Sequence, residues 1–217
     1  YDRIWFDHFA PNFDYKIKYI ESRISPDNCI LAKGYDAVCV FVNDPVTAEV
    51  IDILHEMGIK AILLRCAGYN NVEYKHAFEK IHIMRVPAYS PFAVAEYAAA
   101  LLLAVNRKTH RAYSRTRDYN FNINGLMGVD LNNKTAGIVG TGRIGRIMIN
   151  ILKGCGMRVI AYDLFPPKDT DIEMVDLETI WKESDVISLH CPLTPETKHM
   201  INKNTISKMK DGVMLIN

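Results

Sequence analysis

The stretch TAGIVGTGRIGRIMINILKGCGMRVIAYD, residues 135–163, carries the clearest pattern in the chain. The apolar residues at 136–139 predict a buried strand. After the glycines, apolar side chains recur at the spacing of one helix face, at Ile144, Ile147, Met148, Ile151 and Leu152. A second apolar run, at 158–162, ends at Asp163. The stretch therefore predicts a strand, a helix and a second strand that closes on an acid.

Three glycines, Gly140, Gly142 and Gly145, follow the first strand with the spacing GxGxxG. In dinucleotide-binding loops the first glycine permits a tight turn, the second lets the backbone approach a pyrophosphate, and the third lets helix and strand pack closely. The helix N-terminus offers free N–H groups to phosphates. Asp163 stands 18 residues after Gly145 (163 minus 145), where a carboxylate can accept hydrogen bonds from ribose hydroxyls. Because that carboxylate repels a 2′-phosphate, the pattern favours NAD over NADP.

The length and composition predict a globular protein with hydrophobic cores and nearly equal numbers of acidic and basic residues. The 217 residues amount to one large domain or two small ones, and 49% of them are hydrophobic. The net charge of +1 provides no global field for nucleic acid. No apolar run approaches the roughly 18 residues of a membrane span, and the five cysteines include no CxxC pair. We expect a cytoplasmic protein with no nucleic-acid partner, no membrane partner and no metal site.

The first third of the chain alternates strand and helix patterns. Strands are expected at 15–20, 37–42, 61–64 and 81–86, the second of them buried. Thr47 is a plausible cap for a helix that Gly58 ends, and a short helical stretch is expected before residue 81. This alternation predicts a parallel sheet with helices on both faces, which binds ligands at the carboxyl ends of its strands. RCAGYNN, at such an end, is therefore a possible site.

The pattern changes at PAYSPFAVAE, residues 87–96, where Ser90 can cap a helix with Pro91 at its first position. One long helix is expected from Phe92 to about Arg117, as a hinge and bridge between two domains. Further elements are expected downstream of residue 163: helices at 177–182 and 203–209, and strands at 185–189 and 213–216. Four strands then follow residue 130, against about six in a full dinucleotide fold. We expect the second mononucleotide half to be missing.

Four segments in this order resemble the D-isomer-specific 2-hydroxyacid dehydrogenases: VPAYSPFAVAE, LNNKTAGIVGTGRIGRI, DVISLHCPLTPETKHMI and MKDGVMLIN. PAYSP and RCAGYNN narrow the resemblance to the D-lactate and D-2-hydroxyisocaproate dehydrogenase branch. The resemblance implies an α/β protein with two doubly wound parallel-sheet domains. A flavodoxin-like substrate domain, begun by residues 1–90, would hold an inserted Rossmann NAD-binding domain, begun by residues 91–217, and both would be incomplete in this chain.

The resemblance assigns the substrate side of the site. Ala67 and Gly68 would offer backbone N–H groups to the substrate carboxylate, and Tyr89 would line the same cleft. Plainer interpretations stay open, because Arg65 beside them can merely pair with a carboxylate and Tyr89 can pack in the hinge.

The resemblance also assigns the NAD side. Arg143 and Ile144 would contact the pyrophosphate and Asp163 the ribose. The adenosine side would be bordered by His190, Cys191, Pro192 and Thr197. A structural role for His190 at the end of a strand remains the alternative.

The arginine and the Glu-paired histidine that catalyse the reaction in this family follow the LIN motif with which this chain ends. We therefore expect no catalytic residue before Asn217, and since general acid-base catalysis contributes about 10² to 10⁴ in rate, the chain alone should be nearly inactive. We expect a truncated or partly covered copy of a longer, homodimeric NAD-dependent D-2-hydroxyacid dehydrogenase, most simply one that reduces pyruvate to D-lactate. The alternatives are a non-catalytic NAD-sensing protein like the C-terminal-binding corepressors and a dehydrogenase of the phosphoglycerate or formate type.

Overall fold

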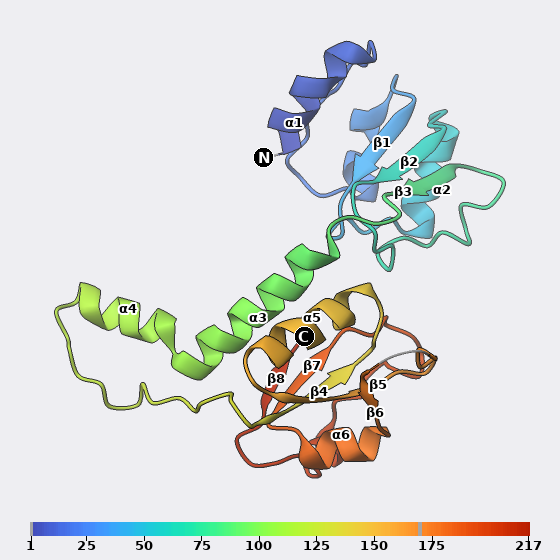
Figure 1. Cartoon of the computed structure of the whole chain (residues 1–217). Coiled ribbons are helices and arrows are strands. Elements are labelled where there is room, and N and C mark those ends of the chain that lie inside the picture. The colour runs from blue at the N-terminus through green and yellow to red at the C-terminus, as the bar shows by residue number, and fades with distance from the viewer. Residues whose placement is uncertain (1, 169–170) are drawn as a thin grey trace. The chain divides into compact units, whose positions relative to one another are not determined.

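The computed structural model describes residues 2–168 and 171–217, and the chain divides into two compact units, Tyr1–Tyr89 and Ser90–Asn217 (Figure 1). Tyr1, from which the predicted first domain is numbered, lies outside the described residues. So do Asp169 and Thr170. Within the described ranges, no helix is both long and apolar enough to cross a membrane.

The first unit is built on a three-stranded parallel sheet of order β1-β2-β3. Its elements are α1 (Asp2–Phe9), the 3-10 helices Ala10–Asn12 and Pro26–Ala32, β1 (Ala37–Val40), α2 (Ala48–Glu56), β2 (Ala61–Leu64) and β3 (His82–Arg85). Thr47 caps α2 as predicted, because its Oγ1 accepts a 3.4 Å hydrogen bond from the Val50 N–H. Val50, Ile51 and Leu54 on the inner face of α2 are fully buried. Their burial attaches α2 to the sheet.

Three sequence predictions in this unit are wrong. Residues 15–20 form no strand in the described structure, because alternation supplies an apolar face but no neighbouring strand to bond with. The stretch before residue 81 makes turns rather than a helix, and Glu79 there has a φ of +61° that no helix tolerates. The strand predicted at 37–42 ends at Val40, and Cys39 within it is exposed, so β1 is not buried on both faces.

The second unit is a doubly wound α/β domain, which confirms the predicted fold class. Its parallel sheet has the order β6-β5-β4-β7-β8. The strands are β4 (Thr135–Val139), β5 (Arg158–Tyr162), β6 (Glu173–Met174), β7 (Val186–Leu189) and β8 (Met214–Ile216). The helices are α3 (Pro91–Arg107), α4 (Thr109–Arg117), α5 (Arg143–Gly154), α6 (Leu177–Glu183) and α7 (Lys203–Ile206).

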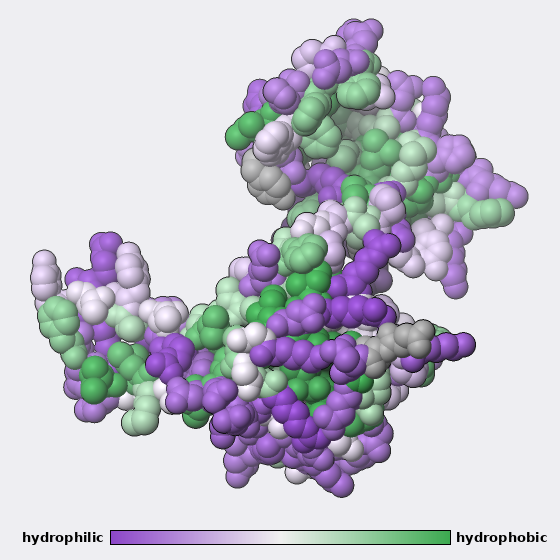
Figure 2. All heavy atoms as spheres, in the orientation of Figure 1, coloured by the Kyte–Doolittle hydropathy of each residue, from purple (hydrophilic) through white to green (hydrophobic). Residues whose placement is uncertain are grey.

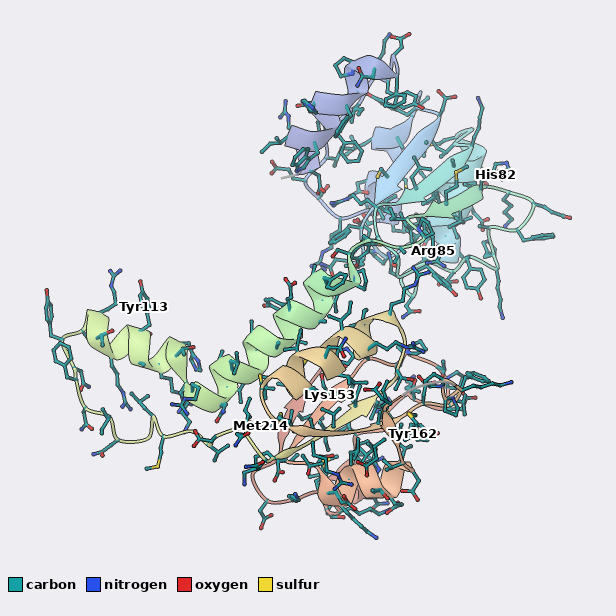
Figure 3. All side chains as sticks on the ribbon, viewed as in Figure 1. His82, Arg85, Tyr113, Lys153, Tyr162 and Met214 are labelled. Atoms are coloured by element: carbon teal, nitrogen blue, oxygen red, sulfur yellow. The ribbon has the colours of Figure 1, made fainter. Side chains whose placement is uncertain are left out.

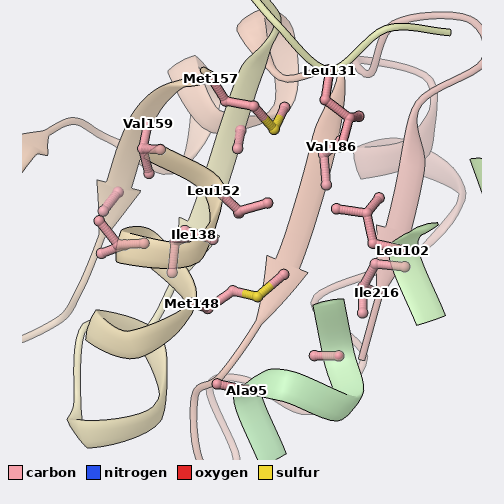
Figure 4. Close-up of a cluster of buried hydrophobic side chains, with 14 residues drawn as sticks. Ala95, Leu102, Leu131, Ile138, Met148, Leu152, Met157, Val159, Val186 and Ile216 are labelled. Carbon is pink, nitrogen blue, oxygen red and sulfur yellow. The ribbon is translucent and has the colours of Figure 1, made fainter. Parts of the chain in front are cut away.

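Helices cover both faces of this sheet. On one face, α3 and α5 bury a cluster against the strands, in which Ala95 and Leu102 of α3 meet Met148 and Leu152 of α5 (Figure 4). On the other face, Ile180 and Trp181 of α6 are buried. The chain therefore winds outward from β4 in both directions, through β5 and β6 on one side and β7 and β8 on the other. The boundary between β4 and β7 is the switch point at which such sheets bind ligands.

The sequence predicts four strands in this sheet, and the described residues form five. The missed strand, β6, has only two residues, which is too short for any periodic signal. It exists because Ile160 and Ala161 of β5 offer it a parallel partner.

The long helix predicted from Phe92 to Arg117 is two helices. Ser90 caps α3 as predicted, accepting a 3.3 Å hydrogen bond from the Ala93 N–H. The break falls at Lys108, whose φ of 50° and ψ of 37° are left-handed. Its Nζ donates a 2.7 Å hydrogen bond to the Met127 carbonyl, so contact with a later loop accompanies the break. No glycine or proline in the NRKTH sequence signals it.

Two glycines allow the tight connection from β4 to α5. Gly140 has a φ of +98°, a left-handed conformation that side chains disfavour. A Cβ atom on Gly145 would lie 1.9 Å from the Gly140 carbonyl oxygen. The close helix–strand packing predicted for Gly145 is therefore confirmed.

Gly145→Ala should lower the free energy of unfolding by about 2 kcal/mol or more, because the contact is with backbone that cannot rotate away. Gly154→Ala is the matched control in the same helix, since, apart from its chain neighbours and the adjacent helix backbone, no described atom lies within 4 Å of its Cβ position. That variant should be neutral or gain about 0.4 to 1 kcal/mol. Urea unfolding of both variants measures the difference, and equal stabilities would contradict the packing argument.

Candidate functional site

Three segments that the sequence analysis singles out meet at the carboxyl edge of the second sheet. Val139 pairs with Tyr162 of β5 and with Leu189 of β7, so these three strands end side by side. Gly140, Asp163 and His190 are the residues that follow them. The His190 N–H donates to the Val139 carbonyl at 2.8 Å, and a Cβ on Gly140 would lie 2.7 Å from the His190 carbonyl carbon. The glycine loop and the His190 loop are therefore in contact.

The N-terminus of α5 is open toward an anion. Gly142 is the N-cap and supplies no side-chain hydrogen bond. The first backbone bond of the turn runs from the Arg146 N–H to the Gly142 carbonyl at 3.0 Å, which leaves the N–H groups of Arg143, Ile144 and Gly145 ahead of it without a helical acceptor. Apart from its two chain neighbours, no atom of the described residues lies within 4 Å of the Cβ position of Gly142. Free N–H groups, the helix dipole and the exposed Arg143 side chain suit a phosphate group.

The carboxylate of Asp163 is held in place by the glycine loop. One oxygen accepts hydrogen bonds from the N–H and Oγ1 of Thr141, at 2.6 and 2.9 Å. The other accepts from the Phe165 N–H at 2.9 Å. Partial burial raises the pKa of this carboxyl group, but the hydrogen bonds from Thr141 and Phe165 outweigh the burial and hold the pKa below its ordinary value. The group is therefore charged at neutral pH, and its remaining lone pairs can accept hydroxyl groups.

Sequence reasoning did not single out Thr141. Its side chain is buried, with 3% of its surface exposed, and it ties the loop to Asp163. The only available signal was its place between two glycines that must face a ligand.

The loop after β7 is closed by its own hydrogen bonds. His190 Nε2 lies 2.9 Å from the Oγ of the fully buried Ser188, and burial lowers the pKa of the imidazole, so the ring is neutral at pH 7. Burial likewise raises the pKa of the Cys191 thiol. Thr197 Oγ1 donates to the Pro192 carbonyl at 2.7 Å. His190, Cys191, Pro192 and Thr197 therefore lie together in the loop at the end of β7, where the contact of His190 with Ser188 is one that the structural interpretation of His190 expects.

The substrate-side residues of the prediction belong to the first unit. Ala67 and Gly68 follow β2, and among the described residues neither backbone N–H has a hydrogen-bond partner. Tyr89 ends the unit with 59% of its surface exposed, and within the described residues no hydrogen bond or ring contact joins it to Ala67 or Gly68. Arg65 pairs with Asp2, and its guanidinium lies 4.4 Å from the centre of the Phe41 ring. The plainer interpretation of Arg65 is therefore confirmed.

No group of three or more His, Cys, Asp or Glu residues within 2–168 and 171–217 is arranged to hold a metal ion. The chemistry that these residues offer is the binding of anions and hydroxyls by backbone N–H groups and one carboxylate. Together with the strand order, the glycine loop and Asp163 define the second unit as a dinucleotide-binding domain.

Comparison with known families agrees. Residues 99–217 match the family model described as "D-isomer specific 2-hydroxyacid dehydrogenase, NAD binding domain". The chain belongs to the D-isomer-specific 2-hydroxyacid dehydrogenase family, whose members are NAD-dependent oxidoreductases.

Three of the similar proteins are named as D-lactate dehydrogenases, one of them putative. A putative D-lactate dehydrogenase of Dictyostelium discoideum is 51% identical over 98% of this chain and 64% of its own length. The apo structure of D-lactate dehydrogenase from Escherichia coli is 45% identical and matches with a TM-score of 0.92, over 99% of this chain and 69% of that one. D-lactate dehydrogenase from Aquifex aeolicus, solved with NAD and lactic acid, is 34% identical with a TM-score of 0.81, over 99% of this chain and 65% of that one. The chain spans about two thirds of the length of these relatives.

Asp163→Asn should destabilise the fold by about 1 kcal/mol at pH 7, because a partly exposed carboxylate that accepts several hydrogen bonds becomes neutral. The pKa of Asp163 is lower in the folded protein than its ordinary value of 3.8, so its contribution is complete above that pH and is lost as the pH falls through the folded pKa. The stability gap between wild type and variant should therefore shrink below pH 3.8.

Urea unfolding at a series of pH values tests this expectation. Asp118→Asn serves as the control, since the Asp118 carboxylate accepts no hydrogen bond from the part of the chain that the structure describes. A gap that is independent of pH would show that the charge of Asp163 does not stabilise its loop.

Proposed function

We propose that this chain is part of an NAD-dependent D-2-hydroxyacid dehydrogenase that acts as a D-lactate dehydrogenase and reduces pyruvate. The observation that carries the proposal is the joint presence of an NAD-binding domain and of 45 to 51% identity to relatives named for D-lactate. In this proposal residues 1–90 belong to the substrate domain and residues 91–217 to the NAD-binding domain. The proposal is favoured over the phosphoglycerate and formate types by the names of these relatives.

The residues of the second unit fit NAD. The N–H groups of Arg143 and Ile144, with Gly142 at the cap, would hold the pyrophosphate. These N–H groups have no capping side chain as an acceptor. Asp163 would accept the ribose hydroxyls, and its charge disfavours a 2′-phosphate. Gly140 and Gly145 bring the helix end close to the strand. The border would be formed by His190, Cys191, Pro192 and Thr197.

The substrate would be bound through its carboxylate. Ala67 and Gly68 would donate their backbone N–H groups to it, and Tyr89 would line the cleft. Bound NADH supplies the hydride for the keto carbon. We do not assign the proton transfer to His190, since its Nε2 is held by Ser188 and burial lowers the pKa of its imidazole.

The proposal is tested by measuring NADH oxidation by the whole protein with a panel of 2-keto acids. We expect the highest kcat/KM with pyruvate, and a preference for NADH over NADPH that Asp163→Ala reduces. Absence of turnover with every 2-keto acid would overturn the proposed function. An unchanged cofactor preference in Asp163→Ala would overturn the role of that carboxylate alone.

A cytoplasmic location is part of the proposal. All five cysteines are free thiols, and Cys29 and Cys66 among them are buried. Free buried thiols fit a reducing compartment.

We further propose that the whole protein is a homodimer that associates through α3 and the segment after it. The exposed face of α3 carries large apolar side chains, among them Phe92 and Tyr97, which are 57 and 67% exposed. The loop after α4 adds Phe121, Ile123 and Met127, which are 73 to 85% exposed. Figure 2 shows apolar side chains, drawn in green, among polar ones on α3 and on the loop after α4. An exposed apolar surface of this extent fits a self-association interface.

Ile123→Asp and Met127→Asp together should shift the protein from dimer to monomer in sedimentation velocity, because two charges would be desolvated at the interface. Ile4→Asp and Phe78→Asp, exposed apolar residues of the first unit, form the control pair. A wild-type monomer, or an equal shift by the control pair, would contradict the interface.

A further inference from the structure

Arg85 contacts the loop between Cys66 and Tyr69 at two points. It is the last residue of β3 (Figure 3), and its Nη1 donates a 2.7 Å hydrogen bond to the Ala67 carbonyl. Its guanidinium carbon lies 5.3 Å from the centre of the Tyr69 ring. The two contacts lie on either side of Gly68.

Holding the Ala67 carbonyl also orients the next N–H. In a trans peptide unit the carbonyl of one residue and the N–H of the next point in opposite directions. The Gly68 N–H therefore points away from Arg85, and it has no hydrogen-bond partner among the described residues. Cys66 Sγ lies 3.3 Å from the Gly68 carbonyl and limits rotation of the following peptide unit.

Arg85 and Tyr69, which contact each other across this loop, are both held by other residues of the first unit. Leu64 pairs with Arg85 in the sheet, and the Val86 N–H donates to the Leu64 carbonyl at 3.2 Å. The Tyr69 ring packs edge-on against Tyr74, with 5.4 Å between ring centres. A guanidinium suits this position because its planar fork can donate to a carbonyl while its flat face lies over an aromatic ring.

We propose that Arg85 is a positioning residue for substrate binding: it fixes the Ala67–Gly68 peptide unit so that the Gly68 N–H is presented to the carboxylate of the 2-keto acid. This inference rests on the proposed function. Arg65, the other arginine beside the loop, does not act in this way, because Asp2 and Phe41 already hold its guanidinium.

Arg85→Met in the whole protein tests the proposal. We expect the KM for pyruvate to rise about tenfold while kcat and the KM for NADH stay near wild type, because a binding contact is lost equally in the ground state and the transition state. Binding of oxamate, an unreactive pyruvate analogue, to the NADH complex should weaken by a similar factor. Arg85→Lys keeps a hydrogen-bond donor but loses the planar group over the ring. Its KM for pyruvate should therefore lie between those of wild type and Arg85→Met.

Lys60→Met is the matched control, because Lys60 is an exposed cation paired at 2.9 Å with Asp36, just before β2 begins. It should leave both KM values unchanged. If Arg85→Met fails to fold, Arg85→Lys carries the test through its pyruvate KM and its oxamate affinity. A pyruvate KM within about twofold of wild type in the variant tested, or an equal rise in the KM for NADH, would overturn the role of Arg85. Failure of the wild type with every 2-keto acid would instead overturn the proposed function.

Discussion

The close approach of the Gly145 backbone to the Gly140 carbonyl is the constraint on which the second unit depends. Because a Cβ at position 145 would lie 1.9 Å from that oxygen, only a glycine lets the first turn of α5 lie against the end of β4. The same approach brings the free N–H groups of the helix to the edge where β5 and β7 also end. A helix displaced outward by one methyl group would lose this packing, and its N-terminus would no longer lie beside the strand ends. The glycine therefore serves both the stability of the unit and the geometry of the site.

Asp163 extends this constraint to the neighbouring strand. Because Thr141 donates two hydrogen bonds to its carboxylate, the end of β5 and the glycine loop hold one another in a fixed geometry. The carboxylate thus has a structural role even without a bound dinucleotide. The two roles do not compete, since an ionised carboxylate has more acceptor positions than the three donors in this loop occupy. The hydrogen bonds that orient the group also keep its pKa low, which keeps it charged at neutral pH.

The sequence predicted the elements whose signal is local and long enough. The strand, helix and strand from residue 135 to 163 were confirmed, as were the caps Thr47 and Ser90, because periodicity and capping side chains act within a few residues. The predictions were wrong where a residue far away in the sequence determines the local structure. β6 exists only because β5 pairs with it, and residues 15–20 have the strand pattern without a partner. The break at Lys108 accompanies a contact with Met127, nineteen positions away, which no local pattern encodes. For the same reason Thr141 and Arg85 were not found: their importance lies in which carbonyl or carboxylate they reach.

Both units place unpartnered backbone N–H groups at the carboxyl ends of parallel strands, but they orient those groups by different means. In α5 the helix itself fixes the direction of its first N–H groups, while Thr141 and Asp163 hold the loop that precedes the helix. Residues 66–69 belong to no helix or strand, and a peptide unit in such a loop can rotate unless its carbonyl is bound. Arg85 and Cys66 occupy those carbonyls. The requirement to present N–H groups is thus met by regular structure in one unit and by side chains in the other. Substitutions near the first unit's loop should accordingly change the direction of its N–H groups more readily than substitutions on the surface of α5 change those of the helix.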